Sequence, residues 1–174
     1  MTGSYTYQYP RPGLTVDAVI VADGRRPEVL LIKRKNDPFA GSWALPGGFV
    51  DENETLDHAA ARELEEETGL SAEQGLMTQV GAFGDPGRDP RGWCVSVAYA
   101  ALVPANREVQ GADDADEAKQ WWPLDQLPKP LAFDHKLILR TAFRHLAGNP
   151  GPSSATVTAL KQAAEALEGS WQQQ

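Results

Sequence analysis

The sequence predicts an α/β fold built as one layered domain. Three observations support this prediction: β-rich runs bounded by turn-forming residues, helical periodicity in other segments, and a length of 174 residues, which suits a single domain. A chain of this size hides roughly 70% of its unfolded surface, so it can form a hydrophobic core without cross-links.

The first elements predicted along the chain are a β-hairpin and a long loop. The runs LTVDAVIVA (14–22) and EVLLIKRK (28–35) are β-rich, and the turn-like DGRRP separates them. The segment 36–53 follows as a long loop. We expect short strands within this loop, around Trp43 and Phe49.

A helix is predicted from Thr55 to Thr68. Thr55 suits the N-cap position because its hydroxyl can accept a hydrogen bond from a free N–H of the first turn. Gly69 should end the helix, since glycine commonly follows the last turn. An apolar stripe recurs every four residues, at Leu56, Ala60 and Leu64.

The second half of the chain is predicted to contain three strands and two helices. Strands are predicted over 75–83, 93–103 and 119–124, and helices over 133–148 and 155–168. The segment 84–92 is rich in turn formers and should be a loop. The predicted organisation is an aromatic N-terminal arm (1–13), a domain (14–148), and a linker with a C-terminal helix and tail (149–174).

Composition narrows the class of protein. The net charge of −8 gives no basic footprint for nucleic acid, so we expect no nucleic-acid partner. The single Cys94 excludes an internal disulfide and favours a reducing compartment. The N-terminus does not resemble a signal peptide, and no apolar run approaches the ~20 residues of a membrane span. We therefore expect a cytoplasmic protein without a membrane partner.

The stretch RELEEETGL (62–70) places four glutamates beside the predicted helix end. Like charges three and four residues apart repel by a few tenths of a kcal/mol per pair, and acids near a helix C-terminus oppose the helix dipole. At about 100° per residue, Glu63, Glu66 and Glu67 fall within an arc of about 100°. Two interpretations stay open: a solvated acidic face, or a site for a hard cation, which prefers oxygen ligands.

The residues upstream favour the cation site. Gly47 and Gly48 form a turn before the same helix and let the backbone approach a ligand closely, although an ordinary turn would explain either glycine alone. Glu54 can reach back toward Arg62 and hold this loop against the helix.

From Gly48 to Leu70, the sequence GFVDENETLDHAAARELEEETGL resembles the complete Nudix box. The box reads Gly, five residues, Glu, seven residues, then Arg-Glu-aliphatic-any-Glu-Glu-any-Gly-aliphatic. The nine matching positions are Gly48, Glu54, Arg62, Glu63, Leu64, Glu66, Glu67, Gly69 and Leu70. This resemblance implies a Nudix hydrolase with an α/β/α sandwich, in which the box helix packs on a mixed central β-sheet.

The resemblance also implies the reaction and its metal. Nudix hydrolases cleave nucleoside diphosphates linked to another moiety, using Mg²⁺ or, alternatively, Mn²⁺. By the same resemblance Glu63, Glu66 and Glu67 are metal ligands, the carbonyl of Gly47 is a further ligand, and Glu63 and Glu67 are the catalytic glutamates. A metal neutralises the pyrophosphate and lowers the pKa of a bound water.

A further acid must accept the proton of the attacking water. Some Nudix enzymes use a box glutamate for this step, and others use an acid on a later loop. The later acids here precede the sequence WW, and they are Asp113, Asp114, Asp116 and Glu117. We favour Asp114 or Asp116, with a solvated acidic loop as the alternative interpretation.

The flanks of the box suggest a substrate. Pro86 lies sixteen positions beyond Leu70, which resembles the proline marker of ADP-ribose pyrophosphatases. The segments YQYPRPGLTVDAVIVA, GDPGRDPRGWCVSVAYAAL and LAFDHKLIL are similar to those of the nicotinamide-linked ADP-ribose subgroup, so the resemblance covers most of residues 7–147. It implies hydrolysis of ADP-ribose to AMP and ribose 5-phosphate. Nucleoside diphosphate sugars, NADH-like dinucleotides and oxidised nucleotides are the alternatives.

Four residues are the candidates for binding this substrate. Arg88 and Arg91 can offer forked donors to phosphate or ribose, and Arg34 follows a strand and can meet phosphate. Phe39, or alternatively Trp43, can stack on adenine. The competing interpretations are that Arg88 and Arg91 lie in a solvent-exposed turn, that Arg34 is a charged strand end, and that the aromatic residues belong to the core.

A binding module is the competing class of function. The flanks also resemble transcriptional regulators in which a Nudix-like domain senses ADP-ribose ahead of a winged-helix domain. Only some 25 residues follow position 149, which we judge too few for a winged helix. The expected partner is therefore a small-molecule nucleotide. A homodimer, with the arm crossing to a second copy, is a further option drawn from the family.

Overall fold

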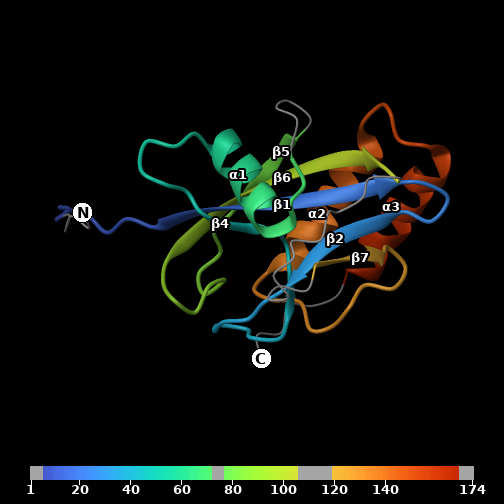
Figure 1. The fold of residues 1–174 in the computed structure, drawn as a ribbon. Coiled ribbons are helices and arrows are strands. Elements are labelled where there is room, and N and C mark those ends of the chain that lie inside the picture. Colours follow the sequence, from blue (N-terminus) through green and yellow to red (C-terminus); the bar gives the residue numbers. More distant parts are fainter. Residues whose placement is uncertain (1–5, 72–76, 106–118, 169–174) are drawn as a thin grey trace.

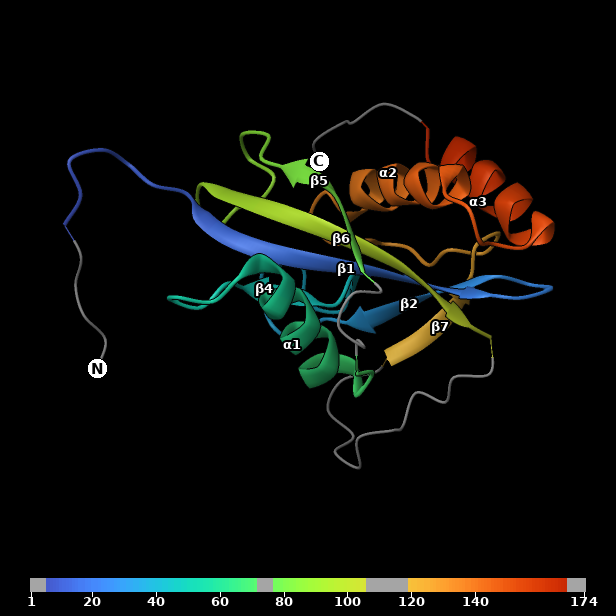
Figure 2. The same ribbon diagram turned by 90° about the horizontal axis from the view of Figure 1, so that it is seen from above.

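A central mixed β-sheet lies between helices in this computed structural model, which describes residues 6–71, 77–105 and 119–168. Helix α1 (Leu56–Thr68) covers one face of the sheet, and α2 (His135–Gly148) and α3 (Ser154–Ala166) cover the other (Figure 1, Figure 2). The expected α/β/α sandwich with a mixed sheet is confirmed.

The sheet has seven strands in the order β3-β2-β1-β6-β5, while β4 also pairs with β1 and β7 with β2. Among the paired strands of the described residues, β1 and β6 run parallel, in register from Gly13 opposite Cys94 to Asp23 opposite Pro104. The other pairs are antiparallel. The strands are β1 (Gly13–Asp23), β2 (Glu28–Lys33), β3 (Trp43–Ala44), β4 (Gly47–Phe49), β5 (Thr78–Phe83), β6 (Cys94–Pro104) and β7 (Lys119–Pro123).

Strand β1 is buried on both faces, which explains its nearly continuous apolar sequence. Ala18 and Ile20 pack with Leu64 of α1 on one side of the sheet. Val19 and Val21 pack with α2 and α3 on the other side. Successive strand residues point to opposite faces, so both helical layers need apolar residues from this strand.

Helix α1 has the predicted ends. The Thr55 hydroxyl accepts a hydrogen bond of 3.3 Å from the N–H of His58, and Gly69 adopts the left-handed conformation with φ of 72°. The last turn of α1 contains no basic residue. Instead, the Lys119 ammonium of β7 donates to the carbonyl of Thr68 at 2.8 Å, and this cation complements the negative end of the helix.

Three predicted boundaries were wrong by two residues, at the end of β2, the start of α2 and the end of α3. Helix α3 ends at Ala166 rather than at 168. β2 ends at Lys33 because Arg34 exchanges backbone hydrogen bonds with Ser42 and Gly41, which closes a loop. Helix α2 begins at His135 because Phe133 has φ of 50°, a left-handed conformation that no α-helix contains.

Asp23, the last residue of β1, binds the start of α3. Its carboxylate accepts hydrogen bonds from the Ser153 hydroxyl at 2.8 Å and from the Thr156 hydroxyl at 2.5 Å. Ser153 also caps α3, by accepting from the N–H of Thr156. The bond from Thr156 is the main reason that the pKa of Asp23 lies below its usual range. Asp23 therefore fastens α3 to the β1–β2 hairpin.

We predict that Asp23→Ala lowers the free energy of unfolding by about 1 kcal/mol at neutral pH, because the hydroxyls of α3 lose their acceptor. Because the folded-state pKa of Asp23 is depressed, its stabilising effect is fully present above the unfolded-state pKa of about 4. The difference from wild type should shrink as the pH falls below about 4 and vanish below the folded-state pKa. Urea denaturation across this pH range measures both effects. Asp125→Ala is the control, because the Asp125 side chain is 70% exposed. An equal loss in both variants would contradict the assignment.

Candidate active site

The backbone of β4 lies between β1 and α1. Two backbone hydrogen bonds set the register of β4 against β1. The N–H of Val50 donates to the carbonyl of Leu14, and the N–H of Ala18 donates to the carbonyl of Pro46. Gly47 therefore occupies a non-hydrogen-bonded position of the β1–β4 ladder, opposite Asp17. In an antiparallel pair this places the N–H and carbonyl of Gly47 on the side away from β1. The N–H donates to Glu67 Oε2 at 2.8 Å, so the Gly47 backbone meets the glutamate side of α1.

Both positions at the start of β4 require glycine because neighbouring atoms are too close for a side chain. A Cβ atom on Gly47 would lie 2.1 Å from the carbonyl oxygen of Val16. A Cβ atom on Gly48 would lie 2.6 Å from the carboxylate of Glu63. Glu63 and Glu67 therefore both border the Gly47–Gly48 backbone.

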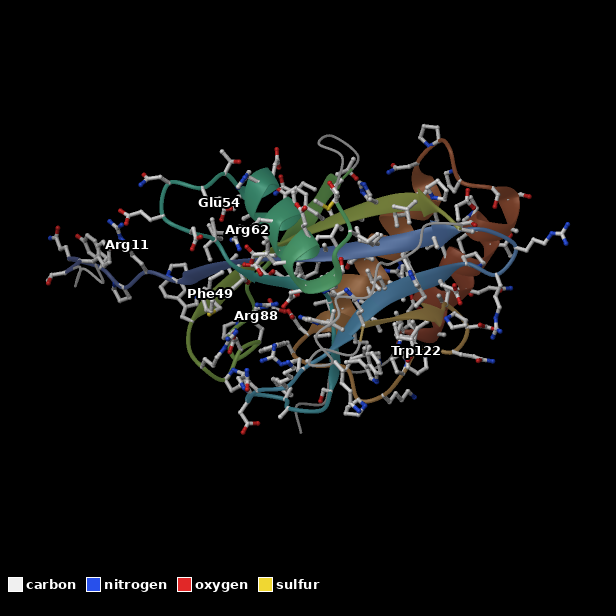
Figure 3. All side chains as sticks on the ribbon, viewed as in Figure 1. Arg11, Phe49, Glu54, Arg62, Arg88 and Trp122 are labelled. Atoms are coloured by element: carbon white, nitrogen blue, oxygen red, sulfur yellow. The ribbon has the colours of Figure 1, made fainter. Side chains whose placement is uncertain are left out.

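Arg62 and Glu54 form a two-pronged ion pair that holds the loop before α1 (Figure 3). The Nε and Nη2 atoms of Arg62 donate to the two oxygens of Glu54, each at 2.8 Å. Nη2 also donates to the carbonyl of Phe49, and Nη1 donates to Glu63 at 2.7 Å. The bonds from Arg62 hold the pKa of Glu54 well below its usual range. Arg62 thus aligns Glu63 as well as the loop.

The glutamates of α1 divide into two groups. Glu63 and Glu67 are oriented by Arg62 and Gly47, whereas the Glu66 side chain is 59% exposed and lies 3.3 Å from Arg62. Within the described ranges, no three acidic, histidine or cysteine side chains already form a metal cage. The candidate metal ligands along the Gly47–Gly48 backbone are all oxygen atoms, which suits Mg²⁺ or Mn²⁺ better than softer metals.

The acids proposed for the general base, Asp114 and Asp116, lie outside the described residues.

A pocket that is open to solvent lies beside β4. Asp17 and His135 line it together with the Gly47–Phe49 backbone, and two arginines, Arg34 and Arg91, line it with Phe133. The pocket therefore joins the Gly47–Gly48 backbone, which Glu63 and Glu67 border, to a cationic and aromatic surface.

Arg88 lies in the wall of this pocket but is buried, with a side chain that is only 4% exposed. Its Nε and Nη2 atoms donate to the two carboxylate oxygens of Asp134, at 2.9 and 2.6 Å. The fork expected to bind substrate is therefore bound to Asp134. This pair fixes the 84–92 loop to the start of α2, and it explains why Asp134 makes no side-chain cap for that helix.

Arg91 is held by a buried carboxylate. Its Nε and Nη2 atoms donate to Asp89, whose side chain is 2% exposed. The guanidinium lies 5.2 Å from the ring centre of Phe49 and 5.5 Å from that of Phe133. Arg91 thus presents a fixed, partly exposed cation between two aromatic rings.

Arg34 differs from Arg91 because no acidic side chain among the described residues lies within ion-pair distance of it. It donates to the backbone carbonyls of Pro38 and Asn36, and its guanidinium lies 4.8 Å from the ring centre of Phe133. Burial, followed by the charge of Arg91, lowers the pKa of Arg34. The carboxylates of Glu67, Asp89 and Asp17 act on its charge from a greater distance. This cation is therefore fixed in place without a direct ion pair.

Phe39 is not among the residues that line the pocket, but its ring meets that of Phe133, which does line it, edge to face with ring centres 4.8 Å apart. Both have positive φ, 66° and 50°, which costs roughly 1 kcal/mol or more for a residue other than glycine. Strain of this kind is concentrated at functional sites. The alternative aromatic residue, Trp43, packs against Trp122 instead.

Asp17, Asp89, Phe133 and His135 line the pocket, and sequence reasoning assigned none of them to the site. Asp17 left a readable signal, since it is the one charged residue inside the buried run LTVDAVIVA, where a charge needs partners. Burial alone would raise its pKa, but His135, Ser96 and Arg88 together hold it below its usual range. The other three residues belong to loops or a helix start, and no spacing indicates that they meet.

Comparison with known proteins agrees with this geometry. The chain is 43% identical over 136 residues to an ADP-ribose pyrophosphatase of Methanocaldococcus jannaschii, covering 78% of this chain and 76% of that protein. It is 41% identical over 142 residues to the ADPR responsive transcriptional repressor NtrR of Acinetobacter baylyi. That match covers 79% of this chain but 56% of the repressor.

The same fold occurs in the NUDIX domain of Shewanella oneidensis NrtR, solved in complex with ADP ribose. The TM-score is 0.68 at 36% sequence identity, covering 79% of this chain and 90% of that chain. The family model for the NUDIX domain matches residues 11–142. The chain therefore belongs to the NUDIX family.

Proposed function

We propose that this protein is a metal-dependent Nudix hydrolase that cleaves the pyrophosphate bond of ADP-ribose, giving AMP and ribose 5-phosphate. The main observation is the convergence of Glu63 and Glu67 on the Gly47–Gly48 backbone beside a pocket that is lined by the cations Arg34 and Arg91. The similarity to an ADP-ribose pyrophosphatase, and to a NUDIX domain that binds ADP ribose, supports the choice of substrate.

Glu63, Glu66, Glu67 and the carbonyl of Gly47 would hold the metal, for which we propose Mg²⁺ with Mn²⁺ as the alternative. When bound, such an ion neutralises the pyrophosphate and activates a water. Arg62 keeps the Glu63 carboxylate against the Gly48 backbone. A proton acceptor is still required, and Asp114 and Asp116 remain our candidates beside the box glutamates.

The pocket would orient the substrate. Arg34 and Arg91 line the pocket and can stabilise the negative charge of the diphosphate, which favours in-line attack. Phe39 and Phe133 form an aromatic wall for the base or the ribose. Arg88 acts indirectly in this proposal, by holding the loop that carries Arg91.

A non-hydrolytic ADP-ribose sensor is the second candidate, because the chain is 41% identical to a repressor that responds to ADPR. The complete box favours hydrolysis. We retain the proposals of a small-molecule nucleotide partner, no nucleic-acid partner, a cytoplasmic location and an optional homodimer. No helix in the described part of the chain has the length and apolar character of a membrane span.

We predict that Glu67→Gln lowers kcat for ADP-ribose by 100-fold or more, roughly the loss seen when a key electrostatic group is removed. The assay incubates protein and Mg²⁺ with ADP-ribose, ADP-glucose, NADH, diadenosine polyphosphates and oxidised dGTP, and separates the products by chromatography. Glu65→Gln removes a neighbouring exposed charge and should keep wild-type activity. ADP-ribose that binds to the wild type without turnover would support the sensor instead.

We predict that Arg34→Gln lowers kcat/KM for ADP-ribose by 10- to 100-fold, which corresponds to the loss of about 1.5–3 kcal/mol for a hydrogen bond to a charged group. Steady-state kinetics gives the ratio. Arg25→Gln is the matched control, since Arg25 is exposed in the β1–β2 turn. If both variants keep wild-type kcat/KM, Arg34 does not contact the substrate.

A further inference from the structure

We propose that His135 is a positioning residue that connects the buried Asp17 to the backbone of Leu45, and so holds the Gly47 carbonyl toward the metal site. The inference rests on the metal-binding part of the proposed function. It does not depend on the identity of the substrate. His135 is 3% exposed and is the first residue of α2, far in sequence from the Nudix box.

The two nitrogens of His135 have different partners. Nδ1 accepts a hydrogen bond of 2.9 Å from the N–H of Leu45. Since an amide N–H can only donate, Nδ1 carries no proton in this arrangement, so the ring is neutral and its hydrogen lies on Nε2. Nε2 faces Asp17 Oδ1 at 3.3 Å. The carboxylate of Asp17 therefore fixes the tautomer that Leu45 needs.

Asp17 is itself held in place by other elements. The Ser96 hydroxyl of β6 donates to its second oxygen, and Arg88 Nη2 lies 3.9 Å from that oxygen. Arg88 is bound to Asp134, the residue just before His135. The imidazole is consequently anchored to β1, β6 and the 84–92 loop at once, which leaves it little freedom to turn.

The segment from Leu45 to Gly47 depends on this anchor. Its other backbone contacts run from Ala18 N–H to the Pro46 carbonyl and from Gly47 N–H to Glu67. The Leu45 N–H is the remaining donor of the segment, because proline has none, and it is buried with its residue. Without an acceptor at Nδ1 this N–H would be unsatisfied, and the segment would shift to reach water. Such a shift would carry the Gly47 carbonyl away from Glu63 and Glu67.

Two substitutions separate the two functions of the ring. In His135→Asn, the side-chain oxygen can occupy the position of Nδ1 and keep the bond to Leu45, but the shorter side chain cannot reach Asp17. In His135→Gln, the amide can reach Asp17, but no acceptor remains at the Nδ1 position. The positioning role predicts that the Asn variant binds Mn²⁺ within about twofold of wild type, whereas the Gln variant binds it at least tenfold more weakly.

The test titrates Mn²⁺ into purified metal-free protein and follows free Mn²⁺ by electron paramagnetic resonance, without any substrate. His145→Asn and His145→Gln are matched controls on the same helix, and circular dichroism checks the fold of each variant. Equal Mn²⁺ affinities in the two His135 variants, or an unmeasurable affinity in the wild type, would overturn the inference. A difference in Mn²⁺ affinity without turnover of ADP-ribose would leave the inference standing and reject the proposed substrate.

A measurement on the wild-type protein covers the case in which a variant does not fold. The Leu45 amide lies between β3 and β4, outside either strand. If His135 accepts its hydrogen bond, this amide should exchange with solvent at least 100-fold more slowly than a free amide, as followed by NMR. Unprotected exchange at Leu45 would overturn the inference independently of any substitution.

Discussion

The contact between the Gly47–Gly48 backbone and the glutamate helix is the constraint on which the site depends. β4 must approach β1 so closely that a Cβ atom on Gly47 would lie 2.1 Å from a carbonyl oxygen, and its other side must meet Glu63 and Glu67. Only an unsubstituted backbone can satisfy both neighbours. The sheet, the loop before α1 and the start of α2 are all arranged to keep this backbone in place.

The same contact explains how an unfavourable charge cluster is tolerated. Carboxylates near a helix C-terminus repel one another and oppose the helix dipole. Here Arg62 and the N–H of Gly47 each bind one of these carboxylates, and Lys119 places a cation at the last carbonyls of α1. The helix can therefore form with its carboxylates held in place, and their oxygens remain directed at the β4 backbone.

Buried charges under the pocket serve a different purpose from the exposed ones. Arg88, Asp134 and Asp17 form a nearly solvent-free network that joins the 84–92 loop to β1 and α2. Such groups are costly to bury unless each has partners, and once satisfied they allow little movement. Arg91 and Arg34, by contrast, keep part of their charge available to the pocket. The fold thus separates the arginines that build the pocket from those that can meet a ligand.

The sequence by itself determined the layered α/β class, the ends of α1 and the Nudix box, because these features depend on short-range spacing. The N-cap lies three residues from the N–H that it binds, a glycine follows the last turn, and the glutamates share one helical arc.

Tertiary structure alone decided the contacts of the pocket. Arg88 and Arg91 look equivalent in the sequence, yet one is buried against Asp134 and the other is partly exposed over Phe49. His135 and Leu45 are ninety residues apart, and no local rule brings them together. Contacts over such separations follow from how the sheet packs its helices, and a single sequence carries no direct signal of that packing.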